Sequence, residues 1–342
     1  KKMKENKLNN LLDNEEIIDL RLSYSKISDF DRNGPISLIR QTFVDNEGVK
    51  HGSLVETLML DKLLSTNDFD KNYVLLDIEK PTATLGLLVD IILNNYTEVP
   101  TKEEVLNIIN NNAFWGKYKE ETKIANFDIP SFWDYLKIKF EGNSKIIVNQ
   151  GQLKMAENSA DILLTHEFSK DLFYNELENH YQIEFQYYYK GFLIKGFIDK
   201  MTIDRKNKCV YFEDIKTGEG KNDKFMESFI KYRYYFQGLI YQQAFNILAE
   251  KYNFSDYVLM PFKFIYVGKT ESYPLVYTMT DKWIRSALNG FTTTSGYKYK
   301  GLDENLDNIY YHWKNKKYNY SKEVYEKKGS LNLNDDFIEV ND

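Results

Sequence analysis

The sequence has 342 residues, which is long enough for one large domain or two ordinary ones. Hydrophobic residues make up 42% and charged residues 28%, a composition typical of soluble globular proteins that excludes an intrinsically disordered chain. The formal net charge of −6 excludes nucleic-acid binding through overall positive charge, so such binding would need local basic patches.

The composition also predicts the compartment. Cys209 is the single cysteine, which excludes an internal disulfide and a four-cysteine metal site and suits a reducing cytoplasm. The longest apolar run, around "TLGLLVDIIL", is too short for a membrane span and contains Asp90. The polar start "KKMKENKLNN" does not resemble a signal peptide. We therefore expect a cytoplasmic protein without a membrane partner.

The first half of the chain predicts mostly helices. Residues from about 10 to 30 end in "LSYSKISDFDRNGP", which predicts a short helix that stops at Gly34-Pro35. "HGSLVETLMLDKLL" predicts a second helix from apolar residues spaced four apart. Residues 81–178 continue the helical pattern, including "TKEEVLNIINNN" and "NQGQLKMAENSADILLTHEF". No internal repeat or long linker is present, so cleanly separable domains are not expected.

The pattern changes to strands at His180. Runs of β-branched and aromatic residues predict three consecutive antiparallel strands, with a bend at Lys190-Gly191 and a tight turn near residues 205–207. The next stretch predicts one long helix, "FMESFIKYRYYFQGLIYQQAFNILAEKY". Two further strands, "MPFKFIYVG" and "YPLVYTM", and a helix, "DKWIRSALNGF", follow. This order predicts an α/β or α+β fold with a sheet near the middle.

One stretch, "VYFEDIKTGEG", places an acid, a spacer and a lysine at the end of a predicted strand. Residues two apart in a strand share a face, so Asp214 and Lys216 point one way and Glu213 points the other. Asp199, near the end of the preceding strand, is expected across the hairpin from Asp214. Glu184 lies on the strand before that.

This group of residues predicts a metal site. Neighbouring carboxylates repel each other unless a cation lies between them, and an oxygen-only ligand set favours Mg²⁺ or Mn²⁺. A lysine beside such a metal positions water and offsets charge on a reacting phosphate. Judged by spacing alone, a solvated charge pair that closes a hairpin explains Asp214 and Lys216 at least as well. Asp199 speaks against that alternative, because it ends a strand that should be buried, where an unpaired acid is costly.

The stretch "KGFLIKGFIDKMTIDRKNKCVYFEDIKTGEG" resembles the core of the RecB-like PD-(D/E)XK nucleases, in which one strand ends G-x-(I/V)-D and the next ends D-x-K-T. The matching residues are Gly196, Asp199, Asp214, Lys216, Thr217 and Gly218. "YYFQGLIYQQAF" resembles the family's Q-x-x-x-Y motif, with Gln237 and Tyr241 one turn apart. "SYSKISDFDRNGP" and "HGSLVETLML" resemble its entry segment and first helical motif. The order is most similar to the phage-type, RecE-like exonucleases, over about residues 21–245.

The resemblance implies a restriction-endonuclease-like core, with a central mixed sheet flanked by helices and a helical N-terminal part. Residues 1–165 would form that part, 166–295 the nuclease core, and 296–342 a basic, aromatic helix with an acidic tail, all in one integrated domain. The implied activity is a Mg²⁺-dependent or Mn²⁺-dependent exonuclease on linear DNA ends. Its implied role is phage recombination or DNA processing in the host cytoplasm, beside a single-strand annealing protein. Whether the chain forms a homo-oligomer is left open.

The resemblance also assigns roles within the site. Asp199 and Asp214 would hold the metal, and Lys216 would act on the attacking water. The family's first motif usually reads G-x-x-x-H, but alignment of Gly52 with its glycine puts Glu56 in the histidine position. Glutamate is still an oxygen ligand. The alternative for Glu56 is a capping box with Ser53 at the start of a helix.

The remaining expectations concern accessory and DNA-binding residues. Glu184 would be an accessory acid, or simply a polar residue on an open strand face. Gln237 and Tyr241 would orient the site and the DNA backbone, or would only pack their helix. The predicted phosphate contacts are Ser23, Ser25, Thr217, Lys221, Lys231 and Arg233. For the two serines, helix capping is the alternative. The stretch "YYHWKNKKYNYSKEVYEKK" would grip nucleic acid or form a solvated terminal helix.

Two other functions stay open from the sequence. One is a nuclease-fold protein that binds DNA or serves in assembly with weak or no cleavage. The other is a structure-specific endonuclease with the same chemistry. The sequence has no phosphate-binding G-x-x-x-x-G-K-[ST] loop, no G-x-S-x-G elbow and no zinc-like histidine spacing, so we expect neither a fused motor nor a serine or zinc hydrolase.

Overall fold

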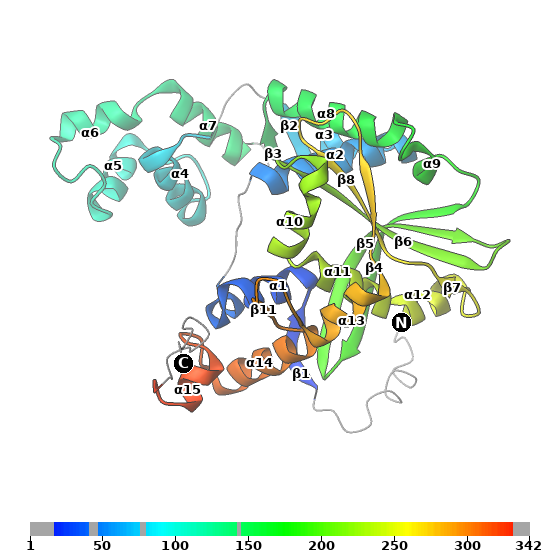
Figure 1. The fold of residues 1–342 in the computed structure, drawn as a ribbon. Helices are drawn as coiled ribbons and strands as arrows, with labels where there is room; N and C mark the ends of the chain where they lie inside the picture. The colour runs from blue at the N-terminus through cyan, green and yellow to red at the C-terminus, as the bar shows by residue number, and fades with distance from the viewer. Residues whose placement is uncertain (1–16, 41–46, 76–79, 142–144, 331–342) are drawn as a thin grey trace, which may run out of the picture. The chain divides into compact units, whose positions relative to one another are not determined.

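The computed structural model describes residues 17–40, 47–75, 80–141 and 145–330 (Figure 1). The chain forms two compact units, one of residues 1–46 with 165–342 and the other of residues 47–164. Residues 1–46, which the sequence grouped with the helical part, belong with the sheet because β1 (Ile18–Leu22) pairs with β5 (Phe192–Asp204). No helix in the described ranges is both long and apolar enough to cross a membrane.

The first unit contains a mixed seven-stranded sheet. The three antiparallel strands expected from residue 180 onward are confirmed as β4 (Glu178–Tyr189), β5 and β6 (Cys209–Gly218). β8 (Lys263–Gly268) runs parallel to β6, and β9 (Leu275–Thr278) runs antiparallel to β8. A short strand, β7 (Val258–Leu259), also pairs with β6, and β1 runs parallel to β5. The expectation of a central mixed sheet flanked by helices is therefore confirmed.

The expected long helix after β6 was wrong, because the structure divides it into α10 (Phe225–Lys231), α11 (Tyr234–Gln243) and α12 (Phe245–Tyr252). Arg233 has left-handed backbone geometry, with φ 61°, and separates α10 from α11. The aromatic side chains of the sheet pack against these helices: the ring centroid of Phe212 lies 6.3 Å from that of Phe245, and Phe264 lies 5.8 Å from Phe229. Large buried rings of this kind dominate core energetics.

The N-terminal and C-terminal segments add helices to the same unit. α1 (Tyr24–Asn33) begins later than the sequence suggested, because β1 precedes it, and ends at Gly34 as expected. α1 lies beside α14 (Leu302–Asn315), which lies beside α13 (Asp281–Asn289) (Figure 1). The smaller elements are η2 (Pro35–Leu38), α9 (Lys170–Phe173), η3 (Asn222–Lys224), β10 (Phe291–Thr292), β11 (Lys298–Tyr299) and α15 (Lys322–Glu326). The expected acidic tail, residues 331–342, lies outside the described residues.

The second unit is mostly helical, as predicted. Its helices are α2 (Glu47–Leu64), α3 (Asp68–Asn72), α4 (Ala83–Asn95), α5 (Lys102–Asn111), α6 (Glu120–Phe127), α7 (Pro130–Glu141) and α8 (Gln150–Thr165). A short parallel pair of strands, β2 (Tyr73–Leu75) and β3 (Ile146–Val148), was not predicted. Helices α4 to α7 share a buried apolar core that includes Leu88 and Phe132.

Candidate active site

The sheet of the first unit forks beside Asp199. On one edge of β5, β1 pairs with residues 192–194 and β6 pairs with residues 200–204, so the intervening residues lie where these two strands diverge. On the other edge, the residue pairs between β4 and β5 are interrupted where Gln182 faces Asp199, and Gln182 has φ 51°. Irregularities of this kind bend a strand and redirect a side chain, often next to active sites.

At this fork the structure brings Asp199 and Asp214 together. In the antiparallel register, Lys200 of β5 pairs with Glu213 of β6. Asp199 and Asp214 are the residues next to this pair, beyond the end of the ladder. Asp199 lies close enough to Asp214 to act on the pKa of its carboxyl group. Oδ2 of Asp199 also accepts a hydrogen bond of 2.8 Å from the backbone N–H of Ile215. This bond satisfies a backbone donor of β6 beyond the end of the β5–β6 ladder.

Lys216 and Gln237 complete the contacts of Asp214, whose exposed fraction is 0%. Nζ of Lys216 lies 2.5 Å from Oδ2 of Asp214, an ion contact without normal hydrogen-bond geometry. Nε2 of Gln237 donates to Oδ1 of Asp214 at 2.5 Å and to the hydroxyl of Tyr241 at 2.9 Å. Gln237 and Tyr241 meet because residues four apart are neighbours on a helix face. Gln237 therefore contacts Asp214 directly, and Tyr241 contacts Gln237.

Burial controls the protonation of this cluster. It raises the pKa of Asp214 above its usual value, and the Lys216 ammonium and the hydrogen bonds with Asp199 and Gln237 oppose only part of that rise. Burial alone would lower the pKa of Lys216, but the Asp214 carboxylate, followed by Tyr234 and Asp199, holds it well above the usual range. The lysine therefore stays charged beside two acids in a poorly hydrated site.

Polar atoms in this cluster lack hydrogen-bond partners. Within the described part of the chain, Oδ2 of Asp214, Oε1 of Gln237 and Oγ1 of Thr217 are buried and make no hydrogen bond. Buried polar groups are almost always satisfied in folded proteins, so several exceptions in one place call for an explanation. Oδ2 of Asp214 meets the Lys216 ammonium, and Thr217 lies on the strand face opposite Asp214, so Oε1 of Gln237 is the atom of this cluster that a ligand could satisfy.

Aromatic residues that the sequence analysis did not single out surround Lys216. Its Nζ lies 5.0 Å from the ring centroid of Tyr234, which lies 6.2 Å from the ring of Tyr24. The hydroxyl of Tyr24 donates to the backbone carbonyl of Tyr232 at 2.6 Å. The alternation of basic and aromatic residues in "KYRYYF", just before Gln237, is the sequence signal that could have pointed to this place.

The structure does not join the two accessory acids to the cluster. Glu56 lies on α2 in the second unit, whose placement relative to the sheet is not determined. The capping-box alternative for Glu56 was wrong, because α2 begins at residue 47 and Ser53 and Glu56 lie inside it. Glu184 is exposed on β4 opposite Phe197, and no contact among the described residues links it to Asp199 or Asp214.

Three of the predicted phosphate-binding residues make contacts within the protein. Ser23 caps α1 by accepting from the backbone N–H of Lys26 at 3.4 Å, so its capping alternative is confirmed. Ser25 shares a hydrogen bond of 2.9 Å with the Ser23 hydroxyl. Arg233 is 9% exposed, and its Nε donates to Oδ2 of Asp31 at 2.6 Å. A guanidinium held in this way supports the turn between α10 and α11.

The other predicted phosphate-binding residues lie closer to the cluster in sequence and are placed differently. Thr217 follows Lys216 on β6 and carries the buried hydroxyl described above. Lys221 and Lys231 are exposed, at the start of η3 and the end of α10. Nζ of Lys231 lies 5.2 Å from the ring centroid of Tyr232.

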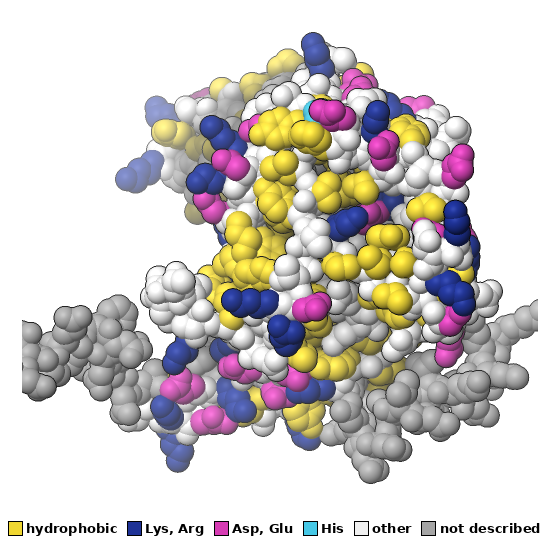
Figure 2. All heavy atoms as spheres, turned by 45° about the vertical axis from the view of Figure 1, so that its right-hand side comes forward, with side chains coloured by type: hydrophobic (Ala, Val, Ile, Leu, Met, Phe, Trp, Pro, Cys, Tyr) yellow, Lys and Arg dark blue, Asp and Glu magenta, His cyan; other side chains and the backbone are white. Residues whose placement is uncertain are grey.

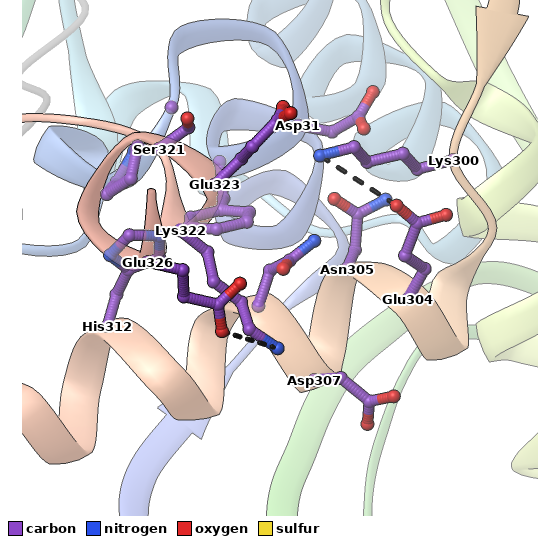
Figure 3. A pocket seen from close by; sticks show the side chains of 14 residues that line it. Asp31, Lys300, Glu304, Asn305, Asp307, His312, Ser321, Lys322, Glu323 and Glu326 are labelled. Carbon is purple, nitrogen blue, oxygen red and sulfur yellow. Dashed lines mark ion pairs between the residues drawn. The ribbon is translucent and has the colours of Figure 1, made fainter. Parts of the chain in front are cut away.

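A separate cavity of about 520 Å³ lies between α1, α14 and α15 (Figure 3). Its acidic side chains are matched by lysines: Nζ of Lys300 lies 3.9 Å from Oε1 of Glu304, and Lys322 lies 3.9 Å from Glu326. Nε of Arg233 holds Asp31. Asp307 and Glu323 likewise lie near lysines outside the lining, Lys190 at 3.3 Å and Lys327 at 2.7 Å, so each acid of the cavity faces a cation of the protein itself. The basic, aromatic C-terminal stretch forms two of its walls.

The donor set of the fork fits a hard divalent cation. Among the residues that the structure describes, no group of three or more His, Cys, Asp or Glu side chains is gathered for a metal. Mg²⁺, however, is commonly held by one or two carboxylates, with water and substrate phosphate as its other ligands. The closeness of Asp199 to Asp214 meets that requirement.

Comparisons with known proteins identify no family. No family model matches this chain, and no curated protein matches it. Among solved structures it is similar to the crystal structure of a "Putative exonuclease" from Eubacterium rectale, at 13% sequence identity and a TM-score of 0.33. The alignment covers 86% of this chain and 95% of that chain. A TM-score this low does not establish a shared fold, so neither fold nor activity is inferred from it.

Proposed function

We propose that this protein is a metal-dependent nuclease of the PD-(D/E)XK type that hydrolyses phosphodiester bonds at the ends of linear DNA. The observation that carries the proposal is the grouping of Asp199, Asp214 and Lys216 at the fork where β1 and β6 diverge along β5. Burying such charges costs several kcal/mol per ion, and buried acids and lysines with shifted pKa values are enriched at functional sites.

Asp199 and Asp214 would hold Mg²⁺ or Mn²⁺ through their carboxylate oxygens. The role of Glu56 as a further ligand stays a prediction from the sequence. When bound, such an ion polarises a phosphoryl oxygen and lowers the pKa of coordinated water. The protein's own contribution is to hold the two carboxylates side by side. It does so with the hydrogen bonds from Ile215 to Asp199 and from Gln237 to Asp214.

Lys216 supplies positive charge at the reacting phosphate. Its ammonium is held by the Asp214 carboxylate and by the face of Tyr234, so it is fixed before substrate arrives. A preorganised cation in a site that excludes water stabilises charge developing on the phosphate oxygens, which is usually the largest catalytic term. Gln237 keeps Asp214 in the orientation that leaves Oδ2 toward Lys216.

The test compares linear and closed-circular DNA with Mg²⁺ or EDTA. We expect linear DNA to be degraded only with the metal and circular DNA to survive. Asp214→Asn and Lys216→Met should each lower the rate by about 10²–10³-fold, as for loss of one preorganised charge or donor. The exposed ion pair between Lys208 and Asp256 offers matched controls, and Lys208→Met and Asp256→Asn should keep the wild-type rate. Survival of linear DNA, or a wild-type rate for Asp214→Asn, would overturn the proposal.

A second candidate is a DNA-binding or assembly component with weak or no cleavage. Two observations favour it. Both Asp214 oxygens are already in contact with protein groups, one with Gln237 and the other with Lys216. Among the described residues, no group of three metal-ligating side chains is present. Metal-independent DNA binding without products would support it. Nicking of closed-circular DNA would instead support the structure-specific endonuclease. The phage role, the annealing partner and the cytoplasmic location stay predictions.

A further inference from the structure

We propose that Arg32, Lys231 and Tyr232 form a surface that binds a single DNA strand and leads it to the candidate active site. This inference rests on the proposed nuclease function, and it names residues and a strand path that the function alone does not. We call these three residues the cation–ring surface.

The geometry is a row of positive charges held on aromatic rings. The guanidinium carbon of Arg32 lies 5.6 Å from the ring centroid of Tyr232, and Nζ of Lys231 lies 5.2 Å from the same centroid. The Tyr232 ring lies 5.7 Å from the Tyr234 ring. Nζ of Lys216 lies 5.0 Å from the Tyr234 ring. Two neighbouring rings thus carry three cations, and the row ends at the candidate catalytic lysine.

The backbone that presents these rings is fixed. The carbonyl oxygen of Tyr232 accepts hydrogen bonds from the hydroxyls of Tyr24, at 2.6 Å, and Ser28, at 2.7 Å. The next residue, Arg233, has a left-handed φ of 61°, which costs a non-glycine residue about 1–3 kcal/mol and persists only where surroundings enforce it. Its ion pair with Asp31 provides that enforcement. Strain of this kind clusters at ligand-binding sites.

The cations on these rings are available for phosphate. Lys231 is exposed, and no ion pair in the described ranges involves it. Arg32 makes a long contact of 3.8 Å between Nη2 and Asp29, and its Nε donates to the Ser28 carbonyl at 3.3 Å. A cation held by a ring rather than by a carboxylate keeps its N–H groups for another anion. This contrasts with Lys300 and Lys322 of the cavity in Figure 3, which lie against glutamates.

A single strand is the partner that fits. Proteins that bind single strands combine cations that follow the backbone with rings on which bases stack. The net charge of −6 means that the attraction must be local. On the face in Figure 2, Lys and Arg side chains are interspersed with Asp and Glu, so that face offers no field of one sign. The cation–ring surface provides both parts at one place.

The experiment measures binding of a fluorescent oligothymidylate to the full chain in EDTA, over a series of salt concentrations. EDTA stops metal-dependent cleavage, so binding is read separately from the nuclease reaction. Lys231→Gln and Arg32→Gln should each lower the slope of log affinity against log salt by about 0.7, the value for one single-strand phosphate contact. Tyr232→Leu removes the ring that holds both cations, and should weaken binding about 5-fold or more.

Lys251→Gln is the matched control, because Nζ of Lys251 also lies over a ring, 5.1 Å from the centroid of Tyr252, on α12. It should keep the wild-type slope. Lys231 is exposed, so its variant should retain the wild-type fold and circular dichroism. Unchanged slopes for both Lys231→Gln and Arg32→Gln, an equal loss in Lys251→Gln, or effects seen only with duplex DNA would overturn the inference. If these effects appear but Mg²⁺ produces no cleavage, the nuclease proposal fails and this surface stands.

Discussion

A buried ion pair on the opposite face of the same hairpin allows stability to be separated from function. Lys200 of β5 and Glu213 of β6 face each other, with side chains 1% and 2% exposed and Nζ 2.5 Å from Oε2. Lys200 also contacts the Thr202 hydroxyl, which donates to Asn179 at 2.9 Å. Burial lowers the pKa of Lys200, and the Glu213 carboxylate opposes that shift. We predict that removal of either partner destabilises the sheet.

The size of the effect follows from burial. Removing one member of a buried pair leaves an uncompensated charge and costs about 3–5 kcal/mol. Total stabilities are about 5–15 kcal/mol, so this is a large share. For a folding unit of about 150–250 residues, the melting temperature should fall by roughly 6–20 °C. Replacing both members by apolar residues removes both charges, so Lys200→Met with Glu213→Leu should be neutral or stabilising by up to about 4 kcal/mol.

The assay is a double-mutant cycle by urea and thermal unfolding, followed by circular dichroism. Lys200→Met and Glu213→Leu should each lose stability, and their combination should recover it. Cleavage per folded molecule should be unchanged in the double variant, whereas Asp214→Asn, one residue away, should lose it. The reasoning is refuted if each single change costs less than about 1 kcal/mol, or if the double variant loses the sum of the two.

Three further predictions follow from single contacts. Gln237→Leu removes a hydrogen bond to the Asp214 carboxylate, and should lower cleavage at saturating DNA by about 10-fold or more without lowering DNA affinity; a wild-type rate would contradict it. Burial lowers the pKa of His312 from 6.5, so the unfolded state binds a proton that the folded state does not. Stability measured by urea unfolding should therefore fall as pH drops below about 6.5, and His312→Gln should flatten that part of the curve. Gly196→Ala would place its Cβ 2.7 Å from Cζ of Phe185, and should cost about 1–3 kcal/mol in thermal unfolding; an unchanged melting temperature would contradict this.

The sequence predicted those side-chain arrangements that depend on the periodicity of a single strand or helix. Alternation along a strand assigned Asp214 and Lys216 to one face and Glu213 to the other, and the structure separates them in that way, with Glu213 paired to Lys200. The spacing of Gln237 and Tyr241 likewise put both on one helix face, where they meet. These relations need only the geometry of one strand or one helix.

Relations that depend on distant contacts were not predictable. The helical pattern runs unbroken through Arg233, yet the helix breaks there because Asp31 of α1 holds the guanidinium. The same long-range packing brings Tyr24 to the backbone of Tyr232. β1 is short, and it forms a strand because it pairs with the edge of β5. In each case, tertiary contacts override local propensity.

The two faces of the β5–β6 hairpin show why one set of charges is structural and the other is a candidate site. On one face, the Lys200 ammonium meets both Glu213 and Thr202, and a second hydrogen bond leads on to Asn179, so the charges are compensated. On the other face, Oε1 of Gln237 is buried without a hydrogen bond in the described structure, and Oδ2 of Asp214 meets the Lys216 ammonium. The two faces of one hairpin therefore differ: the Lys200–Glu213 pair is compensated within the protein, whereas Asp214 and Lys216 are the residues on which the nuclease proposal rests.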